Sequence, residues 1–279
     1  MRVPDRVIQL VDRMAARVAT VKSITSRDNP LLARLRKLVA DPAAYRKLGQ
    51  LWVEGEHLCA AFAQRGGMPL IAVIDEAARE QPALRALAQT AAEIVVVPEA
   101  LMRSISPLDS PARIGFVLAA PGSVAVRPGI PSLVLDRLQD PGNVGNLLRS
   151  AAAFGFSQVL AMKGTVALWS GKVLRAGMGA HFGLHLVEGC EAADLEALQL
   201  PMLGTSSHAA LALPDGDLPW PCAWLLGHEG QGVDAAMAAR CSAVVRIEQP
   251  GGEESLNVAA AGAICLHEST RQRLLRGTD

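Results

Sequence analysis

The chain has 279 residues, of which 50% are hydrophobic and 19% are charged, and its 27 Lys and Arg balance its 27 Asp and Glu. This composition excludes a largely disordered chain, and the length predicts about two domains. The five cysteines have no paired spacing, which argues against a disulfide scaffold or a zinc knuckle and favours buried thiols in a reducing compartment.

Neither the apolar runs nor the N-terminus indicate membrane targeting. A membrane-spanning helix needs about 20 predominantly apolar residues, and the longest apolar run, residues 256–266, is much shorter. The N-terminus has acidic residues among its arginines and no secretory cleavage pattern. We therefore expect a soluble, cytoplasmic protein.

Residues 1–22 carry apolar side chains at helical spacing and predict an amphipathic helix, so that residues 1–21 form an N-terminal helical extension. Residues 22–120 predict a small alternating α/β unit. Its expected helices begin near Pro30 and cover 56–64 and 82–89, and its expected strands cover 50–53, 70–74, 94–97 and 114–119. The first 60 residues hold eleven Lys and Arg against six Asp and Glu, which suits a polyanionic partner but equally describes a solvated helical face.

A linker rich in Pro and Gly, residues 121–131, precedes a second alternating unit, residues 132–279. Expected strands cover 133–135, 158–161, 184–187, 202–204, 223–226 and 244–247, and expected helices cover 143–154, 170–176, 193–198, 233–239 and about 255–275. Because these strands are short and almost continuously apolar, they predict a parallel sheet with helices on both faces. Ligands of such sheets bind at the carboxyl ends of the strands.

The first strand end rich in Gly and polar residues spans residues 136–149. Asn143 follows a Pro-Gly turn and suits the N-cap of the next helix. A cap does not explain Arg149, which follows nearly two helical turns later among apolar and small neighbours. Because burying an unpaired guanidinium is expensive, we expect Arg149 to form a buried ion pair or to face a site.

Two further strand ends share this character. Around Gly227 the glycines allow close backbone approach to a ligand, and two roles are open for Glu229, a helix cap or a site residue. His228 is a weaker candidate for a catalytic base. In residues 247–259 a Gly-rich loop leads into the last helix, where Ser255 suits the N-cap and Asn257 needs a polar partner.

Other nucleotide-binding patterns are missing or irregular in the sequence. It contains no P-loop and no nucleophile elbow, and residues 177–183 miss the dinucleotide fingerprint by one position. A nucleotide-dependent oxidoreductase is therefore the third of three hypotheses.

Together, the three strand-end segments resemble the three motifs of the SpoU (TrmH-type) class of SPOUT RNA methyltransferases. The first motif matches Pro141, Asn143, Gly145 and Arg149. The second motif matches Gly227, Glu229, Gly230 and Gly232. The third matches the Ser-Leu-Asn-Val run at residues 255–258. The likeness is strong over 132–275, and residues 22–120 are more loosely similar to the accessory RNA-binding domain of many members.

The resemblance implies an α/β fold of SPOUT type, with a parallel sheet and a C-terminal trefoil knot, preceded by a smaller α/β RNA-binding domain. It implies S-adenosylmethionine as the cofactor, held in the knot's loops by Thr205, Gly227, Ile247 and Leu256, and no metal. Members of the class are homodimers with the active site at the interface. A homodimer with an RNA partner is therefore expected.

The implied reaction is methyl transfer to a ribose 2′-hydroxyl of RNA, with Asn143, Arg149, Glu229, Ser255 and Asn257 as catalytic residues. Because a guanidinium is a poor base, Arg149 is expected to stabilise the alkoxide or bind phosphate, with a base role left open. Asn143 would position Arg149 and the ribose, and Glu229 would orient Arg149 or a backbone donor. Ser255 and Asn257 would shape the site and hold substrate oxygens.

RNA contact is expected at basic side chains of the accessory domain, namely Arg34, Arg36, Lys37, Arg46 and Lys47. The expected substrate is ribosomal RNA, with transfer RNA open as an alternative. A non-catalytic RNA-binding or ribosome-assembly protein on the same scaffold is the second hypothesis. Two positions depart from the family pattern: Glu248 stands where members often have Pro, and His228 where they often have Asn or Ala.

Overall fold

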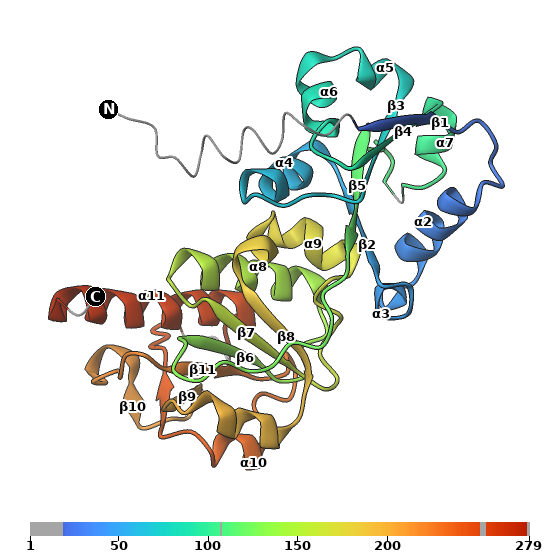
Figure 1. Ribbon diagram of the computed structural model, residues 1–279. Helices are drawn as coiled ribbons and strands as arrows, with labels where there is room; N and C mark the ends of the chain where they lie inside the picture. The colour runs from blue at the N-terminus through green and yellow to red at the C-terminus, as the bar shows by residue number, and fades with distance from the viewer. Residues whose placement is uncertain (1–18, 107, 252–254, 278–279) are drawn as a thin grey trace, which may run out of the picture. The chain divides into compact units, whose positions relative to one another are not determined.

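The computed structural model describes residues 19–106, 108–251 and 255–277 (Figure 1). The chain divides into two compact units between Pro121 and Gly122, where the predicted linker begins. Within the described ranges, no helix has both the length and the apolar character needed to cross a membrane.

The N-terminal unit is built on a five-stranded mixed sheet with the order β1-β4-β3-β5-β2. The strands are β1 (Thr20–Ser23), β2 (Gln50–Glu54), β3 (Ile71–Asp75), β4 (Glu93–Val97) and β5 (Ile114–Ala119). The helices are α2 (Pro30–Ala40), α3 (Ala44–Leu48), α4 (Glu56–Gln64), α5 (Glu76–Arg79), α6 (Pro82–Ala88) and α7 (Glu99–Arg103). β1, β4 and β3 pair in parallel, whereas β5 pairs antiparallel with both β3 and β2.

The helix expected near Pro30 is confirmed as α2. Asn29 caps it by accepting a hydrogen bond from the Leu31 N–H at 2.9 Å, and Pro30 occupies its first position. Its buried face consists of leucines at helical spacing: Leu31, Leu32, Leu35 and Leu38.

The predicted N-terminal helix is wrong at its C-terminal end. Residues 1–18 lie outside the described residues, and Thr20–Ser23 form β1, which pairs with β4. Thr20 and Val21 are β-branched and suit extended backbone. Hydrogen bonding to the sheet edge therefore overrides the apolar periodicity here.

The C-terminal unit is built on a seven-stranded sheet with the order β10-β12-β9-β11-β6-β7-β8. Every strand pairing in the described part of this sheet is parallel, as predicted. The strands are β6 (Ser132–Leu135), β7 (Gln158–Met162), β8 (His185–Cys190), β9 (Met202–Thr205), β10 (Leu211–Ala212), β11 (Ala223–Leu226) and β12 (Ala243–Arg246). The α-helices are α8 (Pro141–Ala153), α9 (Gly171–Gly177), α10 (Ala235–Ala238) and α11 (Val258–Arg276), and short 3-10 helices are η1 (Ala180–Gly183), η2 (Ala192–Leu198) and η3 (Leu213–Asp215).

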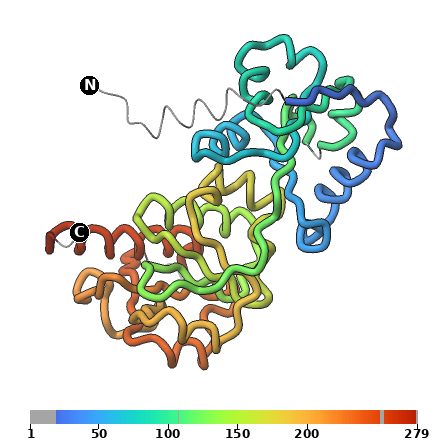
Figure 2. Tube along the Cα trace, in the orientation of Figure 1, coloured from blue at the N-terminus to red at the C-terminus, as the bar shows by residue number. Residues whose placement is uncertain are grey.

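Side chains on both faces of this sheet are buried. Leu133 and Leu135 pack in one core with residues of α8 and α11, whereas Val134 packs in a second core with residues of η2 and α10. This alternation follows from the two-residue period of a strand. On the first face, α11 packs against α8 and β11 (Figures 1 and 2). The prediction that helices cover both faces is confirmed.

Two predicted helix starts are displaced. α8 begins at Pro141 and is capped by Asp140, whose Oδ1 accepts from the Asn143 N–H at 2.7 Å. α11 begins at Val258 and is capped by Asn257 rather than Ser255. An Asp directly before a Pro at the first helical position is the stronger start pattern, and it leaves the Asn143 side chain available for other contacts.

His181 makes the stability of the C-terminal unit depend on pH. Its side chain is buried, with Nε2 2.9 Å from the Leu168 carbonyl oxygen, and burial lowers the pKa of His181 from 6.5 to about 4. Because the unfolded chain binds this proton at a higher pH than the folded chain, stability falls as the pH falls from 6.5 towards 4.

His181→Gln removes this titration and keeps an N–H donor for Leu168. We expect the wild type to lose about 2 kcal/mol of unfolding free energy relative to this variant between pH 7.5 and pH 5. Urea unfolding of both proteins at the two pH values measures the difference. An equal pH dependence of the two proteins would contradict the prediction.

Candidate active site

A pocket of about 550 Å³ lies at the carboxyl ends of β9, β11 and β12. The four residues expected to contact the cofactor, Thr205, Gly227, Ile247 and Leu256, all line it. The carboxyl ends of β9, β11 and β12 therefore converge on this pocket, although long stretches of sequence separate them.

The turn that follows β11 explains the glycine at its start. A Cβ atom on Gly227 would lie 2.2 Å from the carbonyl carbon of Gly232, so no other residue fits without moving the backbone. The turn is closed by the Gly232 N–H, which donates to the His228 carbonyl at 2.8 Å. The Nδ1 atom of His228 accepts from the Gly230 N–H at 3.0 Å, so this nitrogen supports the turn rather than acting as a base.

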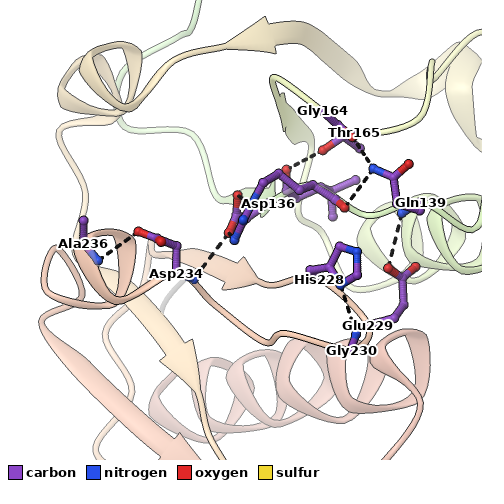
Figure 3. A network of polar contacts seen from close by, with 11 residues as sticks. Asp136, Gln139, Gly164, Thr165, His228, Glu229, Gly230, Asp234 and Ala236 are labelled. Atoms are coloured by element: carbon purple, nitrogen blue, oxygen red, sulfur yellow. Dashed lines mark hydrogen bonds and ion pairs between the residues drawn. The ribbon is translucent and has the colours of Figure 1, made fainter.

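The same turn directs Glu229 towards the start of α8 (Figure 3). Its carboxylate accepts from the Gln139 N–H at 3.3 Å, from the Asp140 N–H at 3.1 Å and from Asn143 Nδ2 at 3.2 Å. Burial alone would raise the pKa of Glu229, but hydrogen bonds from its own N–H and from these three donors hold that pKa below its usual value. Glu229 is therefore an ionised acceptor that orients backbone donors and Asn143.

One chain of hydrogen bonds continues from Asn143 to α11. Asn143 Oδ1 accepts from Asn257 Nδ2 at 2.9 Å, and Asn257 Oδ1 accepts from the Ala259 N–H at 2.9 Å and the Ala260 N–H at 3.3 Å. Because an ionised carboxylate only accepts, Asn143 must turn its amide nitrogen to Glu229 and its oxygen to Asn257. The segments that carry Glu229, Asn143 and Asn257 are thus joined, and the side-chain amides of both asparagines have a determined orientation.

A second network, which is not among the sequence-based predictions, holds the end of β6. Arg137 has a left-handed backbone (φ 58°), and its guanidinium binds both oxygens of the buried Asp136 at 2.9 and 3.0 Å. Asp136 also accepts from the Asp234 N–H at 3.5 Å, and Gln139 Nε2 donates to the Gly164 carbonyl (Figure 3). The sequence signal that could have indicated this network is the Asp-Arg pair directly after an apolar strand.

Arg149 does not join these contacts within one chain. Its side chain is exposed, and it has no hydrogen bond or ion pair among the described residues. Of the two alternatives expected for Arg149, the buried ion pair is therefore excluded within the described residues, and a side chain that faces a site remains. Arg149 lies six residues after Asn143, about 120° away around the helix axis, and so on another face of α8. The expected contacts of Arg149 with Glu229 and Asn143 are absent from the described residues. Ser255 is also exposed, but it lines the pocket.

The pocket suits a nucleoside cofactor with amino donors. Its volume lies in the range typical of small-molecule sites, and Ile247 and Leu256 give it an apolar wall. Gln249 also lines it, and its Oε1 atom is buried without a hydrogen-bond partner among the described residues. A buried acceptor of this kind fits the ammonium or adenine amino group of S-adenosylmethionine. Across the described ranges, no cluster of three His, Cys, Asp or Glu side chains is placed to hold a metal ion.

The five basic residues expected to bind RNA lie on α2 and α3 of the N-terminal unit. Lys37, Arg46 and Lys47 are exposed. Arg34 and Arg36 are half-buried, where Arg34 donates to Gln50 Oε1 at 3.0 Å and Arg36 donates to the Arg27 carbonyl.

Asn257 combines capping and linking, and two substitutions separate these roles. Asn257→Ser is too short to reach Asn143 but keeps a cap acceptor. Because the cap is kept, we expect the unfolding free energy to stay within a few tenths of a kcal/mol of the wild type. Asn257→Ala removes the cap and the link to Asn143, and it should lower the unfolding free energy by about 1 kcal/mol. Urea unfolding measures the difference, and equal losses in the two variants would refute the capping role.

Sequence and structure comparisons agree on one family. The family model described as SpoU rRNA Methylase matches residues 131–267. A Synechocystis protein named as an uncharacterized tRNA/rRNA methyltransferase is 33% identical over 271 residues, which cover 92% of this chain and 97% of that protein. The Bacillus subtilis 23S rRNA (guanosine(2553)-2′-O)-methyltransferase RlmP is 27% identical over 250 residues, covering 88% and 98% respectively.

A solved structure of an AdoMet-bound rRNA methyltransferase from Sinorhizobium meliloti is similar over both units. It superimposes with a TM-score of 0.78 at 25% sequence identity, covering 90% of this chain and 98% of that one. These two relatives and this structure thus match about nine-tenths of the chain that contains the pocket and the hydrogen-bonded motifs. The chain belongs to the SpoU rRNA methylase family.

Proposed function

We propose that this protein transfers the methyl group of S-adenosylmethionine to a ribose 2′-hydroxyl of ribosomal RNA. The observation that carries the proposal is the convergence of Thr205, Gly227, Ile247 and Leu256 on one pocket, beside the hydrogen-bonded chain that begins at Glu229. The printed activity of the Bacillus relative supports ribosomal RNA as the substrate class.

The cofactor supplies a methyl group that its positive sulfur has already activated. Ile247 and Leu256 line the pocket and would pack against the nucleoside, and backbone groups at Thr205 and Gly227 would bind its polar edges. No metal is needed for this donor. A cofactor held in this way would have its methyl group oriented for attack, and such positioning lowers the barrier to transfer.

The ribose side of the reaction is assigned to the polar groups beside the pocket. Asn143 and Asn257, held by Glu229, offer amide groups of determined direction, and the exposed Ser255 hydroxyl lies at the pocket's edge to hold a substrate oxygen. Preorganised amides cost no reorientation when charge develops on the attacking oxygen. The guanidinium of Arg149 stabilises the negative charge that develops on that oxygen, or it binds an adjacent phosphate.

Arg149 reaches a reaction centre if the protein is a homodimer. Arg149 and Asn146 lie on the exposed face of α8, and α11, which packs against α8, exposes Ala260 and Ile264. We assign this small and partly apolar face to the dimer interface. Arg149 of one protomer would then enter the pocket of the second, which accounts for its lack of a hydrogen-bond or ion-pair partner among the residues that the structure describes.

The trefoil knot and the cytoplasmic location are part of the same proposal. After β12, which lies beside β9, the chain returns through Asn257 to Asn143 and packs α11 on α8, a path that suits a knotted C-terminus. The five cysteines are free thiols, four of them buried, which suits a reducing cytoplasm.

Methyl transfer tests the function directly. Purified protein with methyl-labelled S-adenosylmethionine should label unmodified ribosomal RNA, and the label should appear in dinucleotides that resist alkaline hydrolysis. Label in transfer RNA alone would correct the substrate. RNA binding without cofactor binding by calorimetry would favour the non-catalytic assembly protein and overturn the proposal.

Arg149→Ala is expected to lower kcat by at least about a hundredfold, because an electrostatic contact made in the transition state is lost. The dissociation constant for S-adenosylmethionine should change less than about twofold, since Arg149 does not line the pocket of its own chain. Calorimetry and single-turnover transfer measure the two effects. Wild-type turnover in the variant would remove Arg149 from the mechanism.

The exposed basic residues Lys37, Arg46 and Lys47 are proposed to contact RNA phosphates. Replacing all three by Ala should weaken RNA binding and reduce the slope of log affinity against log salt by about two to three, because each lost contact releases about one counterion fewer. Cofactor affinity should be unchanged. An unaltered salt slope would show that RNA does not contact this surface.

A further inference from the structure

Arg246, at the end of β12, and Glu248, just after it, form an ion pair that we call the clamp. We infer that Arg246 is a positioning residue for the cofactor pocket and that Glu248 holds Arg246 in place. The inference rests on the proposed function of this pocket. It assigns a role to Glu248, one of the two positions where the sequence departs from the family pattern.

Arg246 is the last residue of β12, and its guanidinium bridges two parts of the chain. Nη1 donates to the carbonyl oxygen of Ala209 at 3.0 Å and to that of Ala210. Nη2 donates to Glu248 Oε1 at 2.6 Å. One side chain thus joins the end of β12 to the loop between β9 and β10.

That loop, residues 206–210, forms one wall of the pocket, since Ser206, Ser207 and His208 line it. Its first half is held by the backbone, because the Ser206 N–H donates to Val245 at 3.0 Å and the Ala209 N–H donates to Ser206 at 3.2 Å. The carbonyls of its second half point to Arg246. Removing the guanidinium leaves that half of the loop without these contacts.

The positions of Arg246 and Glu248 beside two pocket-lining residues let the clamp act on two walls. Arg246 contacts the loop and Glu248 contacts Arg246, whereas their neighbours Ile247 and Gln249 line the pocket. The clamp therefore sets the position of the loop and also the position of the two side chains that face the cofactor.

The energetic effect of the clamp is expected in binding rather than in stability. The Arg246 and Glu248 side chains are 32% and 57% exposed. Ion pairs with this exposure contribute little to the free energy of unfolding, because water screens them. Their removal should therefore loosen the pocket without unfolding the protein.

Arg246→Ala should raise the dissociation constant for S-adenosylmethionine about tenfold and raise its KM similarly, with kcat at saturating cofactor within about twofold of the wild type. Arg246→Lys, with one point charge in place of a fork, should restore only part of the affinity. Calorimetry, steady-state transfer and thermal melts measure these effects on the full-length protein.

Arg276→Ala is the matched control. Arg276 also donates to a backbone carbonyl, that of Leu218 at 2.6 Å, and pairs with the exposed carboxylate of Asp217, but it lies away from the pocket. This variant should keep the wild-type cofactor affinity. Loss of affinity in both variants to the same degree would show a general effect of arginine removal and overturn the inference.

A double-mutant cycle tests the role of Glu248. Glu248→Ala should weaken cofactor binding less than Arg246→Ala, and the double variant should be no weaker than Arg246→Ala alone, because Glu248 acts through Arg246. Additive losses would refute this dependence, and unchanged affinity in Arg246→Ala would refute the clamp. If the wild-type protein binds no S-adenosylmethionine, the proposed function itself fails, which is a distinct result.

Discussion

The hydrogen-bonded chain from Glu229 through Asn143 to Asn257 is the interaction on which the site depends. It joins three segments that are far apart in the sequence, and it ends on the first N–H groups of α11. The ionised carboxylate gives the chain its direction, because it accepts and never donates. Each amide downstream then has one orientation, so the polar edge of the pocket is set before any ligand arrives.

This series of hydrogen bonds depends in turn on how the sheet brings the ends of its strands together. β9, β11 and β12 are parallel neighbours, so their carboxyl ends open on the same edge. The missing side chain of Gly227 allows the turn after β11 to pass directly against Gly232, which brings Glu229 to the start of α8. The pocket is therefore a consequence of parallel pairing and of one close backbone approach.

The exposed guanidinium of Arg149 and the half-exposed guanidinium of Arg246 show two different uses of arginine. Arg246 is engaged by carbonyls and a carboxylate and shapes a wall of the pocket. Arg149 has no such partner among the described residues and remains available to a second molecule. The proposed role of Arg246 is structural support for cofactor binding, and the proposed role of Arg149 is to supply positive charge at a partner protomer or an RNA phosphate.

The sequence by itself determined the parallel sheet and the helices on both of its faces, because apolar periodicity is a local property. The four residues expected at the cofactor, Thr205, Gly227, Ile247 and Leu256, came from the family resemblance, and all four line the pocket. The sequence did not determine that Asp140 rather than Asn143 caps α8, that Asn257 rather than Ser255 caps α11, or that Thr20–Ser23 join a sheet. It also left Asp136, Arg246 and Gln249 without roles. Only the tertiary structure decided these points, since each depends on which distant backbone or side-chain groups arrive within hydrogen-bonding distance.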